Sequence, residues 1–126
     1  MSGNHEPPIP SISEAALAAC YADAMRCYPD EACGLLLGPR NGTDCDEARS
    51  CENQQNRLHE RDPETFPRTA RTAYSLAPRE ILFLERSRDG ERPVKIVYHS
   101  HVDVGAYFSD EDKRAATFDG EPIYPV

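Results

Sequence analysis

The distribution of apolar residues along the chain predicts a small number of buried strands between helices. Residues Glu31 to Leu37 are apolar after the first acid and are followed by Gly38-Pro39 and Asn41-Gly42, which predicts a buried strand and then a turn or hairpin. The run from Val94 to Tyr98 is β-branched and aromatic, and it predicts a central strand that continues to His101. These two runs are expected to lie inside a sheet.

The N-terminal part of the chain predicts one helix. Ser11 to Glu14 matches a capping box, in which a serine and a glutamate three residues later bind the first free backbone N–H groups. Apolar side chains then recur at helical spacing through Leu17 and Tyr21 until Pro29, which ends the helix. We expect the Leu17/Tyr21 stripe to pack on the sheet, and we interpret this helix as scaffold.

Three further segments complete the expected elements. Residues 43–53 are expected to contain a second strand, and Thr72 to Leu76 another. Pro78, at a first helical position, predicts a helix to about Ser87 that ends at Asp89-Gly90.

A charged, proline-containing segment at residues 57–71 is expected to form a flexible loop. Long loops often bind partners, but a mobile, solvated insertion fits the pattern equally well. His59 in this segment is expected to be exposed rather than a metal ligand. The segment is locally basic in a chain of net charge -8, because Arg57, Arg61, Arg68 and Arg71 outnumber Glu60, Asp62 and Glu64.

Length and composition indicate one domain with its own core. The chain has 126 residues, and we place the domain at residues 11–126 after a disordered, proline-rich lead-in at residues 1–10. The net charge of -8 disfavours non-specific binding to nucleic acid or to an anionic membrane. The five cysteines form no CxxC pair, so we interpret them as reduced thiols of a cytoplasmic protein. The sequence shows neither a signal peptide nor a membrane-spanning segment.

The candidate chemistry centres on His99 and His101 at the end of the predicted central strand. The period of two along a strand places both imidazoles on one face. Asp112 can join them if the chain turns back after Gly105 into a helix that begins at Ser109. Two histidines, one aspartate and an open fourth position are typical of a catalytic zinc site. The serine and the aspartate also fit the N-cap and first turn of a helix, and both interpretations can hold together.

Two residues of the first predicted strand allow more than one interpretation. An acid that enters a buried strand is costly unless a charged group receives it, so Glu31 is either a functional carboxylate or an exposed residue at the strand end. Cys33 on the same face could be a thiol nucleophile or a small buried core residue. No positive group or histidine lies near this cysteine in the sequence, which favours the core.

Together these residues make the sequence resemble the JAB/MPN (JAMM) zinc metallopeptidases. The signature of that family combines His-x-His, a seven-residue gap and Ser-x-x-Asp with a glutamate on an earlier strand. The stretch from Tyr28 to Gly38 resembles the earlier element, and the similarity covers about residues 17–116. It is strongest to small bacterial members that act on sulfur-carrier or ubiquitin-like proteins. Phe108 departs from the pattern, since many members have proline before the serine.

The resemblance implies an α+β, cytidine-deaminase-like fold in which helices flank a mixed central sheet as an α/β/α sandwich. It also implies one Zn²⁺ per chain, held by His99, His101 and Asp112. Glu31 is then the general base, and Ser109 hydrogen-bonds the oxyanion. Relatives usually continue with further strands, so the chain is expected to be either truncated in its C-terminal strands or a minimal version of the domain, with an uncovered sheet edge beside the central strand.

The function implied by the resemblance is zinc-dependent hydrolysis of a peptide or isopeptide bond at the C-terminal Gly-Gly end of a ubiquitin-like or sulfur-carrier protein. The alternative is a non-catalytic protein-binding module, because some relatives have lost the signature. This chain retains every position of the signature, which argues against the alternative. A nuclease or phosphatase that uses the same metal is disfavoured by the acidic charge and by the lack of a second metal-binding motif.

Overall fold

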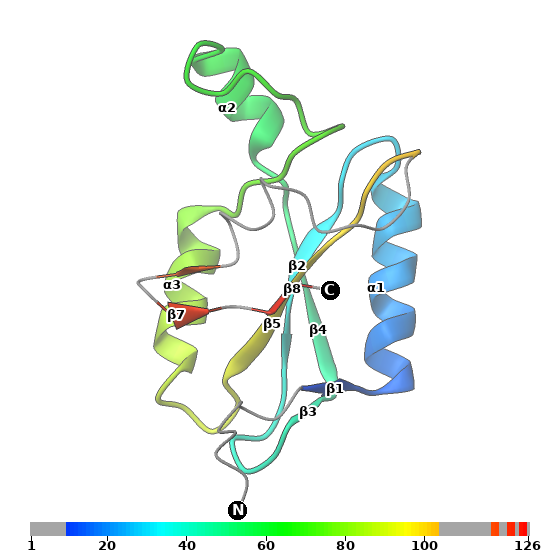
Figure 1. Cartoon of the computed structure of the whole chain (residues 1–126), viewed down its shortest axis with the longest axis vertical. Helices are drawn as coiled ribbons and strands as arrows, with labels where there is room; N and C mark the ends of the chain where they lie inside the picture. Colours follow the sequence, from blue (N-terminus) through cyan, green and yellow to red (C-terminus); the bar gives the residue numbers. More distant parts are fainter. Residues whose placement is uncertain (1–9, 104–116, 119–120, 123, 126) are drawn as a thin grey trace, which may run out of the picture.

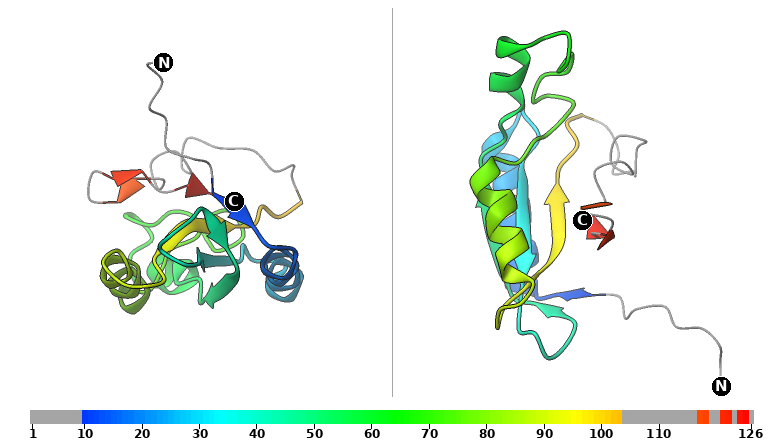
Figure 2. Two further views of the ribbon diagram at one scale, coloured as in Figure 1. Left: turned by 90° about the horizontal axis from the view of Figure 1, so that it is seen from below. Right: turned by 90° about the vertical axis from the view of Figure 1, so that its left-hand side faces the viewer.

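The computed structural model describes residues 10–103, 117–118, 121–122 and 124–125, which form three layers. A four-stranded mixed sheet lies between the helices α1 (Glu14–Cys27) and α3 (Pro78–Ser87), one on each face (Figure 1). Figure 2 shows the same layers from two further directions. The predicted α+β sandwich with helices on both faces is therefore confirmed. Within these ranges, no helix is both long enough and apolar enough to cross a lipid bilayer.

The sheet has the strand order β4-β2-β5-β8. β2 (Cys33–Leu37) is antiparallel to β4 (Glu47–Cys51) and to β5 (Val94–His99). Every residue of β2 is buried, which explains its unbroken apolar sequence. Two short pairs lie outside this sheet: β1 (Ser11–Ile12) with β3 (Asp44–Cys45), and β6 (Thr117–Phe118) with β7 (Glu121–Pro122).

The edge beside the central strand is covered in part. The short strand β8 (Tyr124–Pro125) pairs in parallel with β5, opposite Ile96 and Val97. The expectation of an uncovered edge is therefore wrong at these positions.

Helix α1 packs on the sheet through small residues rather than through the predicted stripe. Its N-cap is Ser13, whose hydroxyl accepts a hydrogen bond from the Ala16 amide at 3.1 Å, so the predicted capping box at Ser11 is wrong. Tyr21 is 64 % exposed, so the predicted Leu17/Tyr21 stripe is also wrong. Small side chains let a helix approach a sheet closely, which leaves the larger tyrosine at the surface. The buried residues of α1 are Ala16, Cys20 and Asp23.

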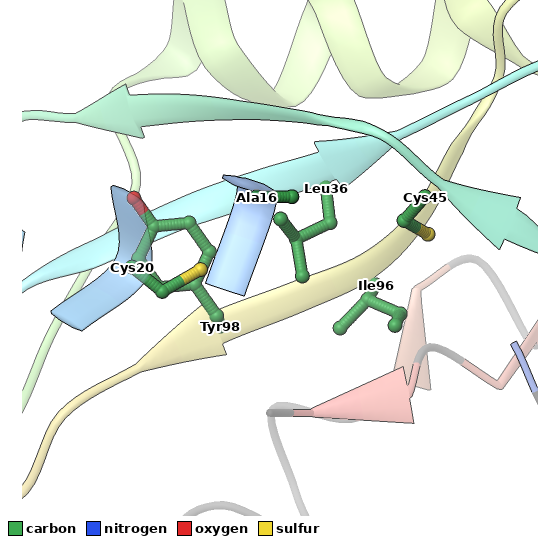
Figure 3. Close-up of a cluster of buried hydrophobic side chains, with 6 residues drawn as sticks. All are labelled: Ala16, Cys20, Leu36, Cys45, Ile96 and Tyr98. Carbon is green, nitrogen blue, oxygen red and sulfur yellow. The ribbon is translucent and has the colours of Figure 1, made fainter. Parts of the chain in front are cut away.

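The core between α1 and the sheet includes a buried carboxylate. Asp23 accepts hydrogen bonds from the Tyr98 hydroxyl at 2.7 Å and from the Ser50 hydroxyl at 2.9 Å, and it also pairs with Arg26. Burial and the neighbouring Asp23 carboxylate raise the pKa of Tyr98, so its hydroxyl remains a donor. The apolar members of this core, shown in Figure 3, are Ala16, Cys20, Leu36, Cys45, Ile96 and Tyr98.

The other face of the sheet packs against α3 and the segment before it. The helix begins at Pro78 and extends to Ser87, as predicted. Its buried Glu80 pairs with Arg49 of β4 at 2.8 Å, which satisfies an acid that would otherwise be costly to bury. The members of this second cluster are Cys33, Leu35, Cys51, Leu84 and Val97, with Tyr74, Leu76, Phe83 and Val94 packed against them.

The segment expected as a flexible loop begins with a helix. Residues Gln55–Arg61 form α2, which lies beyond one end of the sheet (Figure 1). The prediction of a loop at residues 57–71 is therefore wrong for its first part. His59 is half-buried rather than exposed, and its Nδ1 lies 2.8 Å from the Phe66 carbonyl oxygen. This contact draws the residues after α2 back against the helix.

Residues 72–76, which the sequence predicts as a strand, follow an irregular path. The Asn53 side chain donates to the Ala73 carbonyl at 3.0 Å and accepts from the Ser75 amide at 3.1 Å. The Ser75 carbonyl accepts from the Gln54 amide at 2.9 Å. A side chain thus occupies backbone groups that a neighbouring strand would use, which explains why this stretch does not join the sheet.

Gly34 of β2 is a position where one added methyl group should disturb the sheet. It stands opposite Tyr98, and a Cβ at Gly34 would lie 2.3 Å from the tyrosine ring. The ring cannot move aside without breaking its hydrogen bond to Asp23. We expect Gly34→Ala to lower the free energy of unfolding by about 1–3 kcal/mol, as measured by chemical denaturation. Gly90→Ala is the control, because an added Cβ there meets its nearest atom at 3.5 Å; equal midpoints for both variants would contradict this packing.

Several predicted features lie outside the described residues. These are residues 1–9 of the expected lead-in and the helix expected from Ser109, with Asp112 in its first turn.

Candidate functional site

The predicted acid and the two histidines lie near the point where β2 begins and β5 ends. β5 ends at His99, which is paired with Cys33 of β2. Beyond this pair, the Ser100 amide donates to the Ala32 carbonyl at 3.0 Å, and the Ala32 amide donates to the Ser100 hydroxyl at 2.8 Å. Glu31 precedes β2 by two residues, and the period of two along a strand places the imidazoles of His99 and His101 on one face.

The two imidazole rings converge at their ε nitrogens. His99 Nε2 and His101 Nε2 are 3.2 Å apart, with ring centroids 5.0 Å apart and ring planes inclined by 54°. Two nitrogens bound to one tetrahedral zinc at the usual bond length would stand about 3.3 Å apart. The donor set and its spacing are therefore compatible with a zinc ion held between the rings.

The ring of Tyr74 fixes the orientation of His99. The two rings are stacked, with centroids 4.6 Å apart and planes inclined by 18°. Tyr74 belongs to the irregular segment before α3, far from His99 in the sequence. Sequence reasoning missed this residue, because nothing in the local pattern shows that the segment folds back over the end of the sheet.

Glu31 is buried at the entrance to β2, with a side chain only 6 % exposed. Its backbone is fixed at both ends: the amide donates to the Ala70 carbonyl at 2.7 Å, and the carbonyl accepts from the Asn53 side chain at 2.9 Å. The interpretation as an exposed strand-end residue is therefore wrong. A buried acid at the end of the sheet that carries both histidines is a candidate for general acid–base chemistry.

Cys33 is a buried core residue. It stands opposite both Cys51 and His99 in the sheet, and its thiol lies 3.8 Å from the Cys51 carbonyl oxygen. Burial, more than any neighbouring charge, raises the pKa of the Cys33 thiol well above its ordinary value. A nucleophilic cysteine needs a lowered pKa, so the core interpretation is the correct one.

The chain beyond His101 is tied to two other segments through Asp103. The Asp103 carboxylate accepts hydrogen bonds from the Tyr28 hydroxyl at 2.8 and 3.0 Å and pairs with Arg71 at 3.1 Å. Asp103 itself has a φ of 59°, in the left-handed region that aspartate tolerates better than most residues. The loop that leaves the histidine pair is thus connected to the end of α1 and to the segment after α2.

The remaining two predicted site residues, Ser109 and Asp112, lie outside the described residues. Among the residues that the structure describes, no third histidine, cysteine, aspartate or glutamate completes a metal-binding group with the histidine pair. The structure therefore brings His99 and His101 together, and it places the buried Glu31 just before β2, the strand that pairs with β5.

A three-layer sandwich with an acid and a His-x-His pair at adjoining strand ends defines a JAB-type domain. The family model for prokaryotic homologs of the JAB domain matches residues 13–125. The chain belongs to this family.

Two kinds of relative support the assignment. CysO-cysteine peptidases from Mycobacterium tuberculosis and Mycobacterium bovis are 35 % identical over 100 residues, which is 79 % of this chain and 60 % of each relative. The chain thus spans about 60 % of the length of the curated relatives that it matches. The solution structure of protein DSY2949 from Desulfitobacterium hafniense superimposes with a TM-score of 0.60 at 28 % identity, over 83 % of this chain and 65 % of that one.

Proposed function

We propose that the chain catalyses zinc-dependent hydrolysis of a peptide or isopeptide bond at the C-terminal Gly-Gly end of a sulfur-carrier or ubiquitin-like protein. The observation that carries the proposal is the approach of His99 Nε2 and His101 Nε2 to 3.2 Å, at the end of the sheet where the buried Glu31 precedes β2. Asp112 is the proposed third ligand. Zinc held by these residues would polarise the scissile carbonyl and lower the pKa of a water molecule.

Glu31 is the proposed proton carrier. It would accept a proton from the attacking water and then donate it to the leaving amine. The two backbone hydrogen bonds of Glu31 fix its main chain without using the carboxylate oxygens. Ser109 would donate a hydrogen bond to the oxyanion that develops at the carbonyl. Tyr74 contributes by holding the His99 ring in one orientation.

The substrate class rests on the relatives and on the chemistry of a Gly-Gly tail. The mycobacterial relatives are named CysO-cysteine peptidases, which supports a carrier-protein substrate for this chain as well. Glycines offer no side chains to hold, so such a tail is bound through backbone pairing in an extended form. The leaving group is the amine of a free amino acid such as cysteine, or the ε-amine of lysine.

The proposal is tested by incubating the full chain with carrier proteins from the same organism. These carrier proteins end in Gly-Gly, and each is extended by a cysteine or joined to a lysine. Mass spectrometry should show release of the extension and a free Gly-Gly end, and a zinc chelator should abolish the release. Cleavage that persists after complete removal of metal would overturn the zinc-dependent mechanism. A chain that binds the carrier proteins but cleaves none of them would be a binding module.

The arginines around α2 are expected to hold the folded body of the carrier protein. Arg61 and Arg68 are exposed in the locally basic segment of a chain whose net charge is -8. Replacing both with alanine should raise KM for the carrier protein by roughly three- to tenfold, because charge complementarity mainly affects encounter and docking. Cleavage of a short Gly-Gly peptide should not change. Arg71 is left in place because it pairs with Asp103, close to the histidines.

Steady-state kinetics at low and high salt checks this prediction. The increase in KM should shrink as salt rises, since screening weakens the interaction in the unmodified chain. Arg86→Ala on the exposed side of α3 is the control. Equal losses on protein and peptide would mean that the arginines shape the active site itself.

A further inference from the structure

We propose that Asn53 is a positioning residue that sets the places of Glu31 and of the His99 ring at the same time. The inference rests on the proposed function, in which these two residues are the base and a metal ligand. Nothing in the sequence pattern distinguishes Asn53 from the polar residues around it. Its side-chain hydrogen bonds in the structure distinguish it from them.

The side-chain amide of Asn53 uses all of its hydrogen-bonding capacity on the backbone of three segments. Its Nδ2 donates to the Glu31 carbonyl at 2.9 Å and to the Ala73 carbonyl at 3.0 Å. Its Oδ1 accepts from the Gln55 amide at 3.0 Å and from the Ser75 amide at 3.1 Å. An amide has two donor hydrogens and two acceptor lone pairs, so this side chain is fully satisfied.

These four bonds connect the two parts of the candidate site that come from different regions of the chain. One bond holds the backbone of Glu31. Two others hold Ala73 and Ser75, the residues on either side of Tyr74, whose ring stacks on His99 at 4.6 Å. A single side chain therefore fixes both the base and the ring that orients the metal ligand.

Neither aspartate nor alanine can make the same set of contacts. Aspartate has the size of asparagine but donates no hydrogen bond, so its oxygens would face the two carbonyl oxygens and repel them. Alanine would remove all four hydrogen bonds at a partly buried position. Both changes should loosen Glu31 and Tyr74 together while the ligands themselves stay in the chain.

A neighbouring asparagine serves as the matched control. Asn56 lies at the same end of the sheet, on α2, where its Oδ1 accepts from the Ala70 amide at 2.8 Å and its Nδ2 donates to Asp30 at 3.4 Å. An aspartate at this position still accepts the bond from Ala70, and it adds the same charge to the same region as Asn53→Asp. The side-chain hydrogen bonds of Asn56 go to Ala70 and Asp30 rather than to Glu31 or to residues 73–75.

The test uses the full-length chain with Asn53→Ala, Asn53→Asp and Asn56→Asp, and it has two independent measurements. In the first, proton NMR follows the His99 ring, assigned from the signals that disappear in His99→Gln. Stacking under Tyr74 should shift these signals upfield in the unmodified, metal-free chain. Both Asn53 variants should move them towards the values of an unstacked histidine, and Asn56→Asp should not.

In the second measurement, kinetics on a short Gly-Gly peptide separates kcat from KM. The Asn53 variants should bind the same amount of zinc and lose about 10- to 100-fold in kcat, which is the usual cost when groups that orient metal ligands and bases are removed. KM should change by less than about twofold, because the peptide does not contact Asn53. A residue with only a structural role would lower the unfolding temperature and leave the kcat of the folded protein unchanged.

The outcomes separate the inference from the proposed function. Unshifted His99 signals in both Asn53 variants would overturn the inference, even if the unmodified chain is an active zinc enzyme. If the signals shift as expected but the unmodified chain neither binds zinc nor cleaves, the proposed function fails and the positioning role of Asn53 stands.

Discussion

Replacing Glu31 with glutamine should reduce hydrolysis by roughly two to four orders of magnitude and leave bound zinc in place. Glutamine has nearly the size of glutamate and keeps the backbone bonds to Ala70 and Asn53, so the site should retain its shape. It cannot accept a proton from water or pass one to the leaving amine. The loss should therefore appear in kcat, and zinc measured by elemental analysis should match that of the unmodified chain.

Glu80→Gln is the control for this substitution. Glu80 is a second buried glutamate, located on α3, and it pairs with Arg49 of β4. Glu80→Gln should weaken that pair and lower the stability of the fold, yet keep the catalytic rate. If Glu31→Gln is as active as the unmodified chain, Glu31 is no base. If both variants lose activity equally, the loss reflects the burial of an altered side chain rather than proton transfer.

His101→Ala should remove zinc from the chain almost completely. The substitution takes away one of the two nitrogens that meet at 3.2 Å, and loss of one of three protein ligands leaves too few donors to hold the ion. The fold should persist, because His101 lies beyond the end of β5 and belongs to neither core cluster. Elemental analysis and circular dichroism on the same sample measure both expectations.

The control for this second substitution is His59→Ala. His59 is half-buried on α2, and its ring contacts the Phe66 carbonyl rather than the histidine pair. His59→Ala should keep one zinc per chain. Equal metal content in His101→Ala and the unmodified chain would contradict the ligand assignment, and loss of zinc in both variants would mean that disturbance of α2 alone suffices to empty the site.

The elements that the sequence predicts well carry a clear local signal. β2 is an unbroken apolar run, β5 is β-branched and aromatic apart from Lys95 and His99, and α3 begins at a proline in its first turn. The buried face of α1 could not be predicted in the same way. A search for large apolar residues selects Leu17 and Tyr21, whereas close packing on a sheet selects the small Ala16 and Cys20. Asp23 was not expected in the core, because its hydrogen-bond partners Tyr98 and Ser50 come from two strands that are distant in the sequence.

The residues of the candidate site likewise fall into those that the sequence predicts and those that it does not. His99 and His101 were predicted to lie together from residue type and spacing, because a strand's period of two fixes which side chains share a face. Glu31 was assigned a catalytic role through the resemblance to the family signature. Tyr74 and Asn53 were not found. Their roles depend on how residues 72–76 fold back over the end of the sheet, which is decided by side-chain hydrogen bonds to backbone groups rather than by an apolar pattern.

X-ray absorption at the zinc edge, on the chain loaded with one equivalent of zinc, tests the central claim most directly. The chain holds five cysteines, and two of them, Cys33 and Cys51, lie in register with His99 across the sheet. We predict only nitrogen and oxygen neighbours at about 2.0–2.2 Å, with the scattering pattern of two imidazoles and no sulfur at about 2.3 Å. A sulfur neighbour, or a spectrum without imidazole scattering, would contradict a zinc site built on His99 and His101.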